Sequence, residues 1–196
     1  MGLKISYTAG QTPLDEDEKE GLLIETITTK AELDEFEQLN IENAVQWTMQ
    51  QQFRQELLLT GTFIKQLHQK MFSDTWAWAG AFRKTNKNIG VDKLQISIEL
   101  KKLLDDALFW IHNETFEPDE IAVRFKHRIV SIHCFANGNG RHSRLLADVI
   151  AAHIFRQPVF SWGAATSTGD ARMRYLQALK AADLGDMRPL FLFARS

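Results

Sequence analysis

Residues 131–145, SIHCFANGNGRHSRL, constrain the fold more than any other stretch of this chain. The segments on either side, FEPDEIAVRFKHRIVSIH and RHSRLLADVIAAHIF, carry apolar residues at helical spacing. Between them, Gly138 and Gly140 allow a left-handed backbone and leave room for successive N–H groups to converge. The run therefore predicts two helices joined by a glycine-rich turn, with Arg141 opening the second helix.

The predicted turn has the chemistry of an anion site beside a proton acceptor. Backbone donors at a helix N-terminus carry partial positive charge and attract anions. Arg141 and Arg144 are three residues apart, so they share a helix face, and their guanidinium groups match phosphate oxygens. His133 titrates near neutral pH and can accept a proton from an attacking hydroxyl. We expect a bound di- or triphosphate and direct transfer from a nucleotide to a hydroxyl.

Other chemistries fit this sequence less well. Cys134 adjoins His133 but points in another direction on a helix, so we expect it to pack rather than to act as a nucleophile. The chain has no GxxxxGK(S/T) and no HExxH, and GNGRHS lacks the third glycine of GxGxxG. The structural alternative is a plain helix–helix turn with incidental arginines. We expect four other histidines to lie at the surface or in the core: His68, His112, His142 and His153.

The rest of the chain is predominantly helical by its apolar spacing. Further helices are predicted over residues 28–53, 62–72, 98–112 and 171–183, followed by a last short helix after Gly185. The apolar positions of the first of these are Leu33, Phe36, Leu39, Ala44, Trp47 and Met49. Between the second and third helices KLQIS alternates like a strand, which predicts a short β-hairpin near residues 86–98.

Composition restricts the partners of such a chain. Its 196 residues, 44% hydrophobic, suffice for one substantial core. The net charge of −2 provides no general attraction to nucleic acid or to an anionic membrane, so neither is expected as a partner. No apolar run approaches the ~20 residues of a membrane span. A single cysteine and the lack of an apolar leader predict a cytoplasmic protein.

Charge is unevenly divided along the chain. Residues 1–43 carry a net charge of −8, and the remainder carries +6. An acidic arm therefore precedes a basic body. Two interpretations remain open: a solvated tail, or a segment that covers a basic site on the body.

The run HCFANGNGRHSR resembles the signature of the Fic family, HxFx(D/E)GNGRxxR. The similarity extends to WAGAFR, to the NIG hairpin segment and to YLQALKAADLGDMRPL downstream, and the whole chain is similar to a subgroup called mobile mystery protein B. It implies an all-α, Fic-type helical bundle with a short β-hairpin flap and an N-terminal helical arm. We expect residues 1–56 to form the acidic arm with an inhibitory helix, and residues 57–196 to form the Fic domain.

The resemblance implies a protein adenylyltransferase that transfers AMP from ATP, with Mg²⁺, to a Ser, Thr or Tyr hydroxyl of a target protein. In this reading His133 is the general base and Phe135 anchors the loop. The hairpin is the flap that docks the target segment by strand-like pairing. The residues that the family pattern assigns to nucleotide binding are Asn137, Gly138, Asn139, Gly140, Arg141 and Arg144, and those assigned to the flap are Asn88, Ile89 and Gly90.

Two positions depart from the family pattern. Asn137 stands where the family usually has an acidic residue that helps to hold Mg²⁺. An amide oxygen can still ligate the metal, but the site loses a charge. Cys134 replaces a common proline, which we expect to alter rigidity and not chemistry.

Many Fic proteins carry an inhibitory helix with the pattern (S/T)xxxE(G/N). QLNIEN offers Glu42 followed by Asn43, with Gln38 in place of Ser or Thr. We hypothesise that Glu42 pairs with Arg144, against the alternative of an ordinary helix with a solvated glutamate.

Other functions on the same fold remain open. They are use of another nucleotide, transfer of the γ-phosphoryl group, and removal of AMP from a modified protein. A different class is a non-catalytic nucleotide-binding partner in a toxin–antitoxin-like pair, and a companion regulatory protein fits either class.

Overall fold

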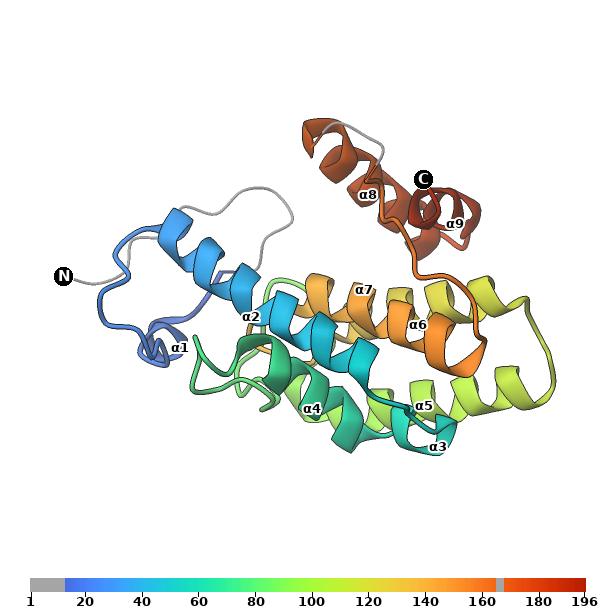
Figure 1. Ribbon diagram of the computed structural model, residues 1–196, viewed down its shortest axis with the longest axis horizontal. Coiled ribbons are helices and arrows are strands. Elements are labelled where there is room, and N and C mark those ends of the chain that lie inside the picture. The colour runs from blue at the N-terminus through green and yellow to red at the C-terminus, as the bar shows by residue number, and fades with distance from the viewer. Residues whose placement is uncertain (1–12, 165–167) are drawn as a thin grey trace.

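The computed structural model describes residues 13–164 and 168–196 (Figure 1). Residues 1–12 of the predicted acidic arm, and the start of the polar segment before the helix predicted at 171–183, lie outside the described residues. Within the described ranges the chain is helical and contains no named strand. The prediction of an all-α helical bundle is confirmed for the described residues.

The helices follow the predicted order with small shifts at their ends. A short α1 precedes the long α2, and a one-turn α3 leads into α4. After a long irregular stretch come α5, α6 and α7, and then a π-helical turn. The bounds are α1 Glu16–Lys19, α2 Lys30–Gln50, α3 Gln55–Leu58, α4 Gly61–Phe72, α5 Ile96–His112, α6 Pro118–Ile132, α7 Asn139–Val149, the π turn Ile150–Ile154, α8 Thr168–Asp183 and α9 Arg188–Ala194.

The central helices α6 and α7 pack together and are covered on different sides. Helix α5 packs on α6, α4 packs on α7, and α2 packs along α4 at the front of the body (Figure 1). The C-terminal pair α8 and α9 pack on each other, and α9 also contacts α6. The largest fully buried side chains include Phe63, Trp76, Phe125 and Phe135, so the core reaches directly to the predicted site.

Local sequence signals explain where α2 and α6 begin. The Thr29 side chain accepts a hydrogen bond from the Glu32 backbone N–H, and the Thr29 backbone N–H donates one to the Glu32 carboxylate, which together form a capping box. Pro118 occupies the first turn of α6, as expected from its fixed φ and missing N–H. Both starts follow from the sequence alone.

The buried face of α2 differs from the predicted one. Its buried residues are Leu33, Glu37, Asn40, Ala44 and Thr48, whereas the apolar Phe36, Leu39 and Met49 are 40%, 55% and 78% exposed. The body offers polar partners to this face: Asp74 N–H donates to Asn40 Oδ1 at 3.0 Å. Specific hydrogen bonds thus override the apolar spacing that was used for the prediction.

The predicted β-hairpin near residues 86–98 does not form. Residues 83–92 are an irregular loop, Lys93–Gln95 form a 3₁₀ turn, and Ile96 already begins α5. Asp92 Oδ1 accepts the Leu94 N–H at 2.8 Å and caps this turn. The alternating residues of KLQIS thus span this 3₁₀ turn and the start of α5, whose buried positions include Ile96 and Leu100.

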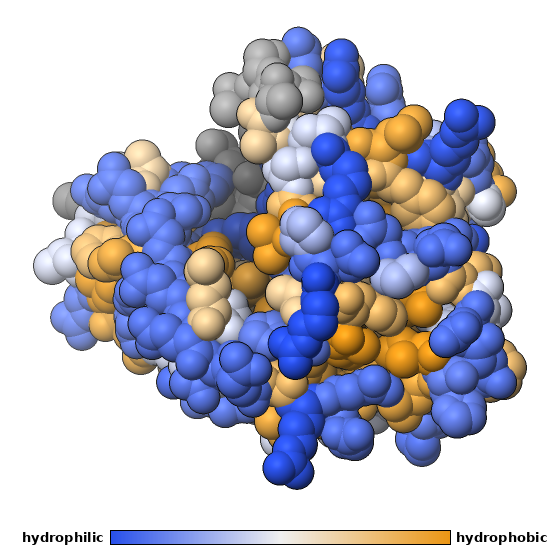
Figure 2. All heavy atoms as spheres, turned by 45° about the vertical axis from the view of Figure 1, so that its right-hand side comes forward, coloured by the Kyte–Doolittle hydropathy of each residue, from blue (hydrophilic) through white to orange (hydrophobic). Residues whose placement is uncertain are grey.

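The surface is mainly polar around this core. Figure 2 shows hydrophilic residues over most of one face, with hydrophobic residues in narrower strips between them. None of the helices within residues 13–164 and 168–196 is both long and apolar enough to cross a membrane.

Candidate active site

His133 ends α6 in a left-handed conformation, with φ 58°. This conformation is uncommon for a residue with a side chain and costs energy, so neighbouring contacts must hold it. Arg83 supplies them: its Nε donates to the His133 carbonyl at 2.6 Å, and its backbone N–H donates to the Cys134 carbonyl at 2.9 Å. Arg83 is buried and belongs to the WAGAFR segment, 50 residues upstream. It therefore fixes the backbone on which the imidazole is carried.

The predicted anion cradle forms at the N-terminus of α7. Gly138 is left-handed, with φ 75°, and an added Cβ would lie 2.5 Å from the Phe72 ring. Only glycine fits there. An added Cβ at Gly140 would meet nothing within 4 Å, so the first turn of α7 is open at this point. The Asn137 Oδ1 accepts the Gly138 N–H at 2.7 Å and so occupies one donor of the cradle.

Asn139 holds the loop from inside. Its Oδ1 accepts the Phe135 N–H at 2.9 Å, and its Nδ2 donates to the Phe135 carbonyl at 2.8 Å. Its side chain is therefore committed to the loop backbone rather than to a ligand. The Phe135 side chain is fully buried, as the anchor role implies.

His68 of α4 supports the same loop and was expected only to be a surface or core residue. Its ring stacks on Phe135 with centroids 3.7 Å apart. The Gly80 N–H donates to its Nδ1 at 3.0 Å, so Nε2 carries the hydrogen and donates to the Asn137 carbonyl at 3.1 Å. Burial, and then the proximity of His142, holds the pKa of His68 well below its usual range. A neutral ring in one tautomer thus positions the cradle.

His133 itself is nearly enclosed, with 5% of its surface exposed. Burial is the main cause that lowers its pKa to about 4, with smaller contributions from the charges of Arg83 and Lys87. The imidazole is neutral at pH 7, which is the protonation state that a general base requires. Burial also raises the pKa of the Cys134 thiol to about 12, so this group packs and does not act as a nucleophile.

The two arginines of the signature already have partners. Arg141 Nη1 lies 2.7 Å from Glu37 Oε2, and Glu37 is only 2% exposed. Arg144 lies over the Tyr175 ring, with 5.7 Å between the guanidinium carbon and the ring centroid. The buried Lys126 also donates to the Tyr175 hydroxyl at 2.6 Å. One arginine is therefore ion-paired to α2, and the other lies against α8.

The predicted pair between Glu42 and Arg144 is wrong. Glu42 accepts a hydrogen bond from Gln38 at 3.0 Å on the outer face of α2. Glu37 is five residues earlier, about 140° away around the helix, and it points into the body. There it also accepts the Trp76 Nε1–H at 2.6 Å. Glu37 was missed because Leu33 and Gln38 stand where the motif requires Ser or Thr and Gly or Asn.

The predicted flap residues Asn88, Ile89 and Gly90 lie in the irregular loop and are exposed. The end of the loop nevertheless contacts the site. An added Cβ at Gly90 would lie 2.6 Å from the His133 Cβ, and the neighbouring Val91 N–H donates to the Ile132 carbonyl at 3.3 Å. The loop therefore packs against His133 even without strand pairing.

Metal ligands of the protein are few at this site. Within residues 13–164 and 168–196, no group of three or more His, Cys, Asp or Glu side chains is placed to hold a metal ion. The Asn137 amide oxygen is half-buried at the edge of the cradle and has the chemistry of a single Mg²⁺ ligand.

Taken as geometry, the site has an anion cradle, two guanidinium groups and a neutral imidazole on one helix–loop–helix unit. In a helical protein, these groups have the chemistry to hold a phosphorylated ligand next to a proton acceptor.

Comparison with known proteins relates part of the chain to one family. Residues 58–151, a little under half of the chain, match the model of the Fic/DOC family and form a Fic domain. A protein adenylyltransferase fic-1 of Caenorhabditis elegans is 31% identical over 118 residues, and a protein adenylyltransferase Fic of Drosophila grimshawi is 29% identical over 143 residues. These matches cover 57% and 71% of this chain but only 21% and 28% of the relatives' lengths.

Solved structures show the same fold. Fic-1 from C. elegans aligns with a TM-score of 0.65 and 23% identity, covering 90% of this chain and 51% of that one. The BepC protein of Bartonella tribocorum, solved with bound AMPPNP, aligns with a TM-score of 0.68 and 17% identity and covers 92% of this chain and 97% of that one. The resemblance seen in the sequence is therefore confirmed.

Proposed function

We propose that this chain is a protein adenylyltransferase that transfers AMP from ATP to a Ser, Thr or Tyr hydroxyl of a target protein. The observation that carries this proposal is the placement of the neutral His133 directly before the cradle of Gly138 and Gly140. Relatives named protein adenylyltransferases support the choice of AMP as the transferred group. The AMPPNP in the BepC structure supports ATP as the nucleotide.

The reaction assigns a task to each group. The target hydroxyl oxygen attacks the α-phosphorus, the bond from that phosphorus to the bridging oxygen breaks, and pyrophosphate leaves. His133 accepts the hydroxyl proton on its ring as the new bond forms. The N–H groups at the start of α7 and the guanidinium groups of Arg141 and Arg144 stabilise the negative charge of the β- and γ-phosphates.

Mg²⁺ would neutralise phosphate charge when bound, and Asn137 is the residue that would hold it. Because an amide contributes no charge, the nucleotide supplies most of the attraction for the metal.

Two features support our proposal that the site is autoinhibited at rest. Glu37 neutralises Arg141, and a phosphate must compete with this buried carboxylate for the guanidinium group. The pKa of about 4 also makes His133 a weak base until the covering loop opens and water reaches the ring. We therefore assign the inhibitory role to Glu37 in place of Glu42. We also propose that the protein is cytoplasmic and that a companion protein relieves the inhibition by Glu37.

The test compares two glutamates of the same helix. Glu37→Gly and Glu42→Gly carry the same backbone penalty, but only the first frees Arg141. With ATP labelled at the α-phosphate and a cell lysate, we expect Glu37→Gly to raise protein labelling roughly tenfold or more, and Glu42→Gly to leave it unchanged.

ATP labelled at the γ-phosphate separates the alternatives. Protein labelling from the γ position alone would indicate phosphoryl transfer. Nucleotide binding with no label transferred from either position in the Glu37→Gly variant would favour the non-catalytic partner.

A further inference from the structure

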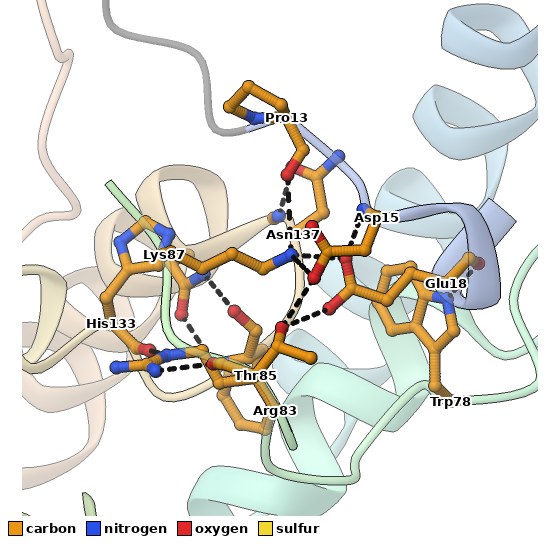
Figure 3. Close-up of polar contacts among 12 residues, drawn as sticks. Pro13, Asp15, Glu18, Trp78, Arg83, Thr85, Lys87, His133 and Asn137 are labelled. Carbon is orange, nitrogen blue, oxygen red and sulfur yellow. Dashed lines mark hydrogen bonds and ion pairs between the residues drawn. The ribbon is translucent and has the colours of Figure 1, made fainter. Parts of the chain in front are cut away.

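The acidic segment of residues 13–18 lies on the loop that covers His133 (Figure 3). Lys87 of this loop reaches two carboxylates, with its Nζ 2.5 Å from Glu18 Oε2 and 2.9 Å from Asp15 Oδ2. The Thr85 hydroxyl also donates to Asp15 Oδ2 at 2.6 Å. Two neighbouring side chains of the loop thus hold two carboxylates of a segment about 70 residues away in sequence.

Lys87 is built into this contact rather than lying on the surface. Its side chain is 3% exposed, and that of Glu18 is 12% exposed. A buried ammonium is costly unless it is paired, and a buried pair is strongly disturbed when one partner is removed. Without the acidic segment, the loop would present an unpaired ammonium beside a hydroxyl donor.

The segment is also held through its backbone. The Trp78 indole N–H donates to the Glu18 carbonyl at 2.9 Å. The Ala77 N–H donates to the Gly21 carbonyl at 2.8 Å, and the Leu23 N–H donates to the Thr75 carbonyl at 2.9 Å. Hydrogen bonds to main-chain atoms do not depend on side-chain identity, so the body can bind other polypeptides in the same way. The charged contacts then determine which polypeptide is preferred.

The contact lies next to the reacting group. Gly90, three residues after Lys87, packs against His133, and Arg83 ties both ends of the loop by donating to the carbonyls of Thr85 and Val91. A polypeptide bound at Lys87 therefore lies close to the imidazole.

We propose that Lys87 and Thr85 form a carboxylate-binding subsite, which the chain's own Asp15 and Glu18 fill at rest and an acidic segment of the target protein fills during transfer. The inference rests on the proposed function, because a target exists only if the site transfers a group to protein. It selects, between the two interpretations of the acidic arm, the one in which the arm covers a basic site.

The experiment measures peptide binding and needs no catalysis. The probe is a fluorescein-labelled peptide with the sequence of residues 13–23, PLDEDEKEGLL. A control peptide with the same label has Asn and Gln at the positions of Asp15 and Glu18. The full chain with Asp15→Asn and Glu18→Gln has an arm without these charges. By fluorescence anisotropy, we expect this variant to bind the acidic peptide roughly tenfold more tightly than the neutral one, and added NaCl to reduce the difference.

Two further substitutions in that double variant locate the subsite. Lys87→Gln should abolish the preference for the acidic peptide. Lys84→Gln removes the same charge from an exposed position of the same loop and should retain the preference. Equal binding of both peptides, or a preference that survives Lys87→Gln, would overturn the proposal.

The binding result is independent of the transfer result. If the preference is present but no AMP reaches any protein, the proposed function fails and the subsite stands. If AMP is transferred but the preference is absent, only the subsite fails.

Discussion

Three buried histidines surround the anion loop: His68, His133 and His142. Each is buried as a neutral ring, and His142 donates from Nε2 to the Ile64 carbonyl at 3.0 Å. Burial lowers the pKa of His142 to about 3 and that of His133 to about 4. The site therefore depends on three imidazole rings. Exposed to water, such rings become protonated near pH 6, whereas burial in this fold keeps them uncharged.

These histidines predict a loss of stability on acidification. In the unfolded chain their pKa is about 6.5, so between pH 7 and pH 4 the unfolded state binds more protons and the free energy of unfolding falls as pH falls. By pH 5, His133 and His142 each account for about 2 kcal/mol, and His68 acts in the same direction. Asp148, whose pKa burial raises to about 6, acts in the opposite direction but is a single group.

Urea titrations at pH 7.5 and pH 5 measure this effect. His142→Gln should reduce the pH dependence by about 2 kcal/mol, and replacement of the exposed His112 by Gln should leave it unaltered. A variant at position 142 with the same pH dependence as the parent would contradict the assignment.

At the scale of elements, α2 shows where sequence patterns succeed and where they fail. The capping box at Thr29 is a local signal, and it fixed the start of the helix correctly. The orientation of the helix depends on Asp74, Trp76 and Arg141, which are 34 or more residues away from their α2 partners. The spacing of apolar residues along a helix does not identify such distant partners. The prediction from this spacing therefore placed Leu39 on the buried face and missed Glu37.

The corrected face of α2 predicts unequal effects on stability for substitutions at two adjacent residues. Leu39→Gln should change the free energy of unfolding by less than about 0.5 kcal/mol, because this side chain is exposed. Asn40→Ala should cost about 1–3 kcal/mol, because the Asp74 N–H loses its acceptor. Chemical denaturation measures the free energy of unfolding of both variants. A larger decrease for Leu39→Gln than for Asn40→Ala would support the buried face that was predicted from the sequence.

The loop over His133 allows a similar matched comparison between two glycines. Gly90 and Gly185 have nearly the same positive φ, 99° and 97°, so alanine at either position carries a similar backbone penalty. Only at Gly90 would the new Cβ meet His133. Gly90→Ala should therefore destabilise the chain more than Gly185→Ala and increase amide hydrogen exchange in residues 83–92. Equal effects of the two substitutions would mean that the loop does not pack on the imidazole.

At the scale of the whole molecule, the sequence predicted a great deal and for identifiable reasons. The order of the helices, the turn at Gly138 and the buried Phe135 follow from local periodicity and from the signature. The docking of residues 13–18 on Lys87 and the ion pair between Glu37 and Arg141 join segments 69 and 104 residues apart. Charged pairs of this separation leave no local pattern, so their partners emerge only when the helices are assembled.

Both long-range contacts act on the same site from the N-terminal side. One pairs an arginine of the cradle, and the other covers the loop above the imidazole. Residues 13–50 thus contact, through Glu18 and Glu37, a site that is built from α4, α6, α7 and the segment that carries Arg83.

The most direct test separates nucleotide binding from proton acceptance. The Glu37→Gly variant, with and without His133→Ala, is incubated with ATP and target lysate, and ATP affinity is measured beside the mass of AMP added to protein. The account predicts that His133→Ala leaves ATP affinity within about twofold and lowers AMP transfer by about 100-fold or more. AMP transfer that persists at the parent rate without the imidazole would contradict it.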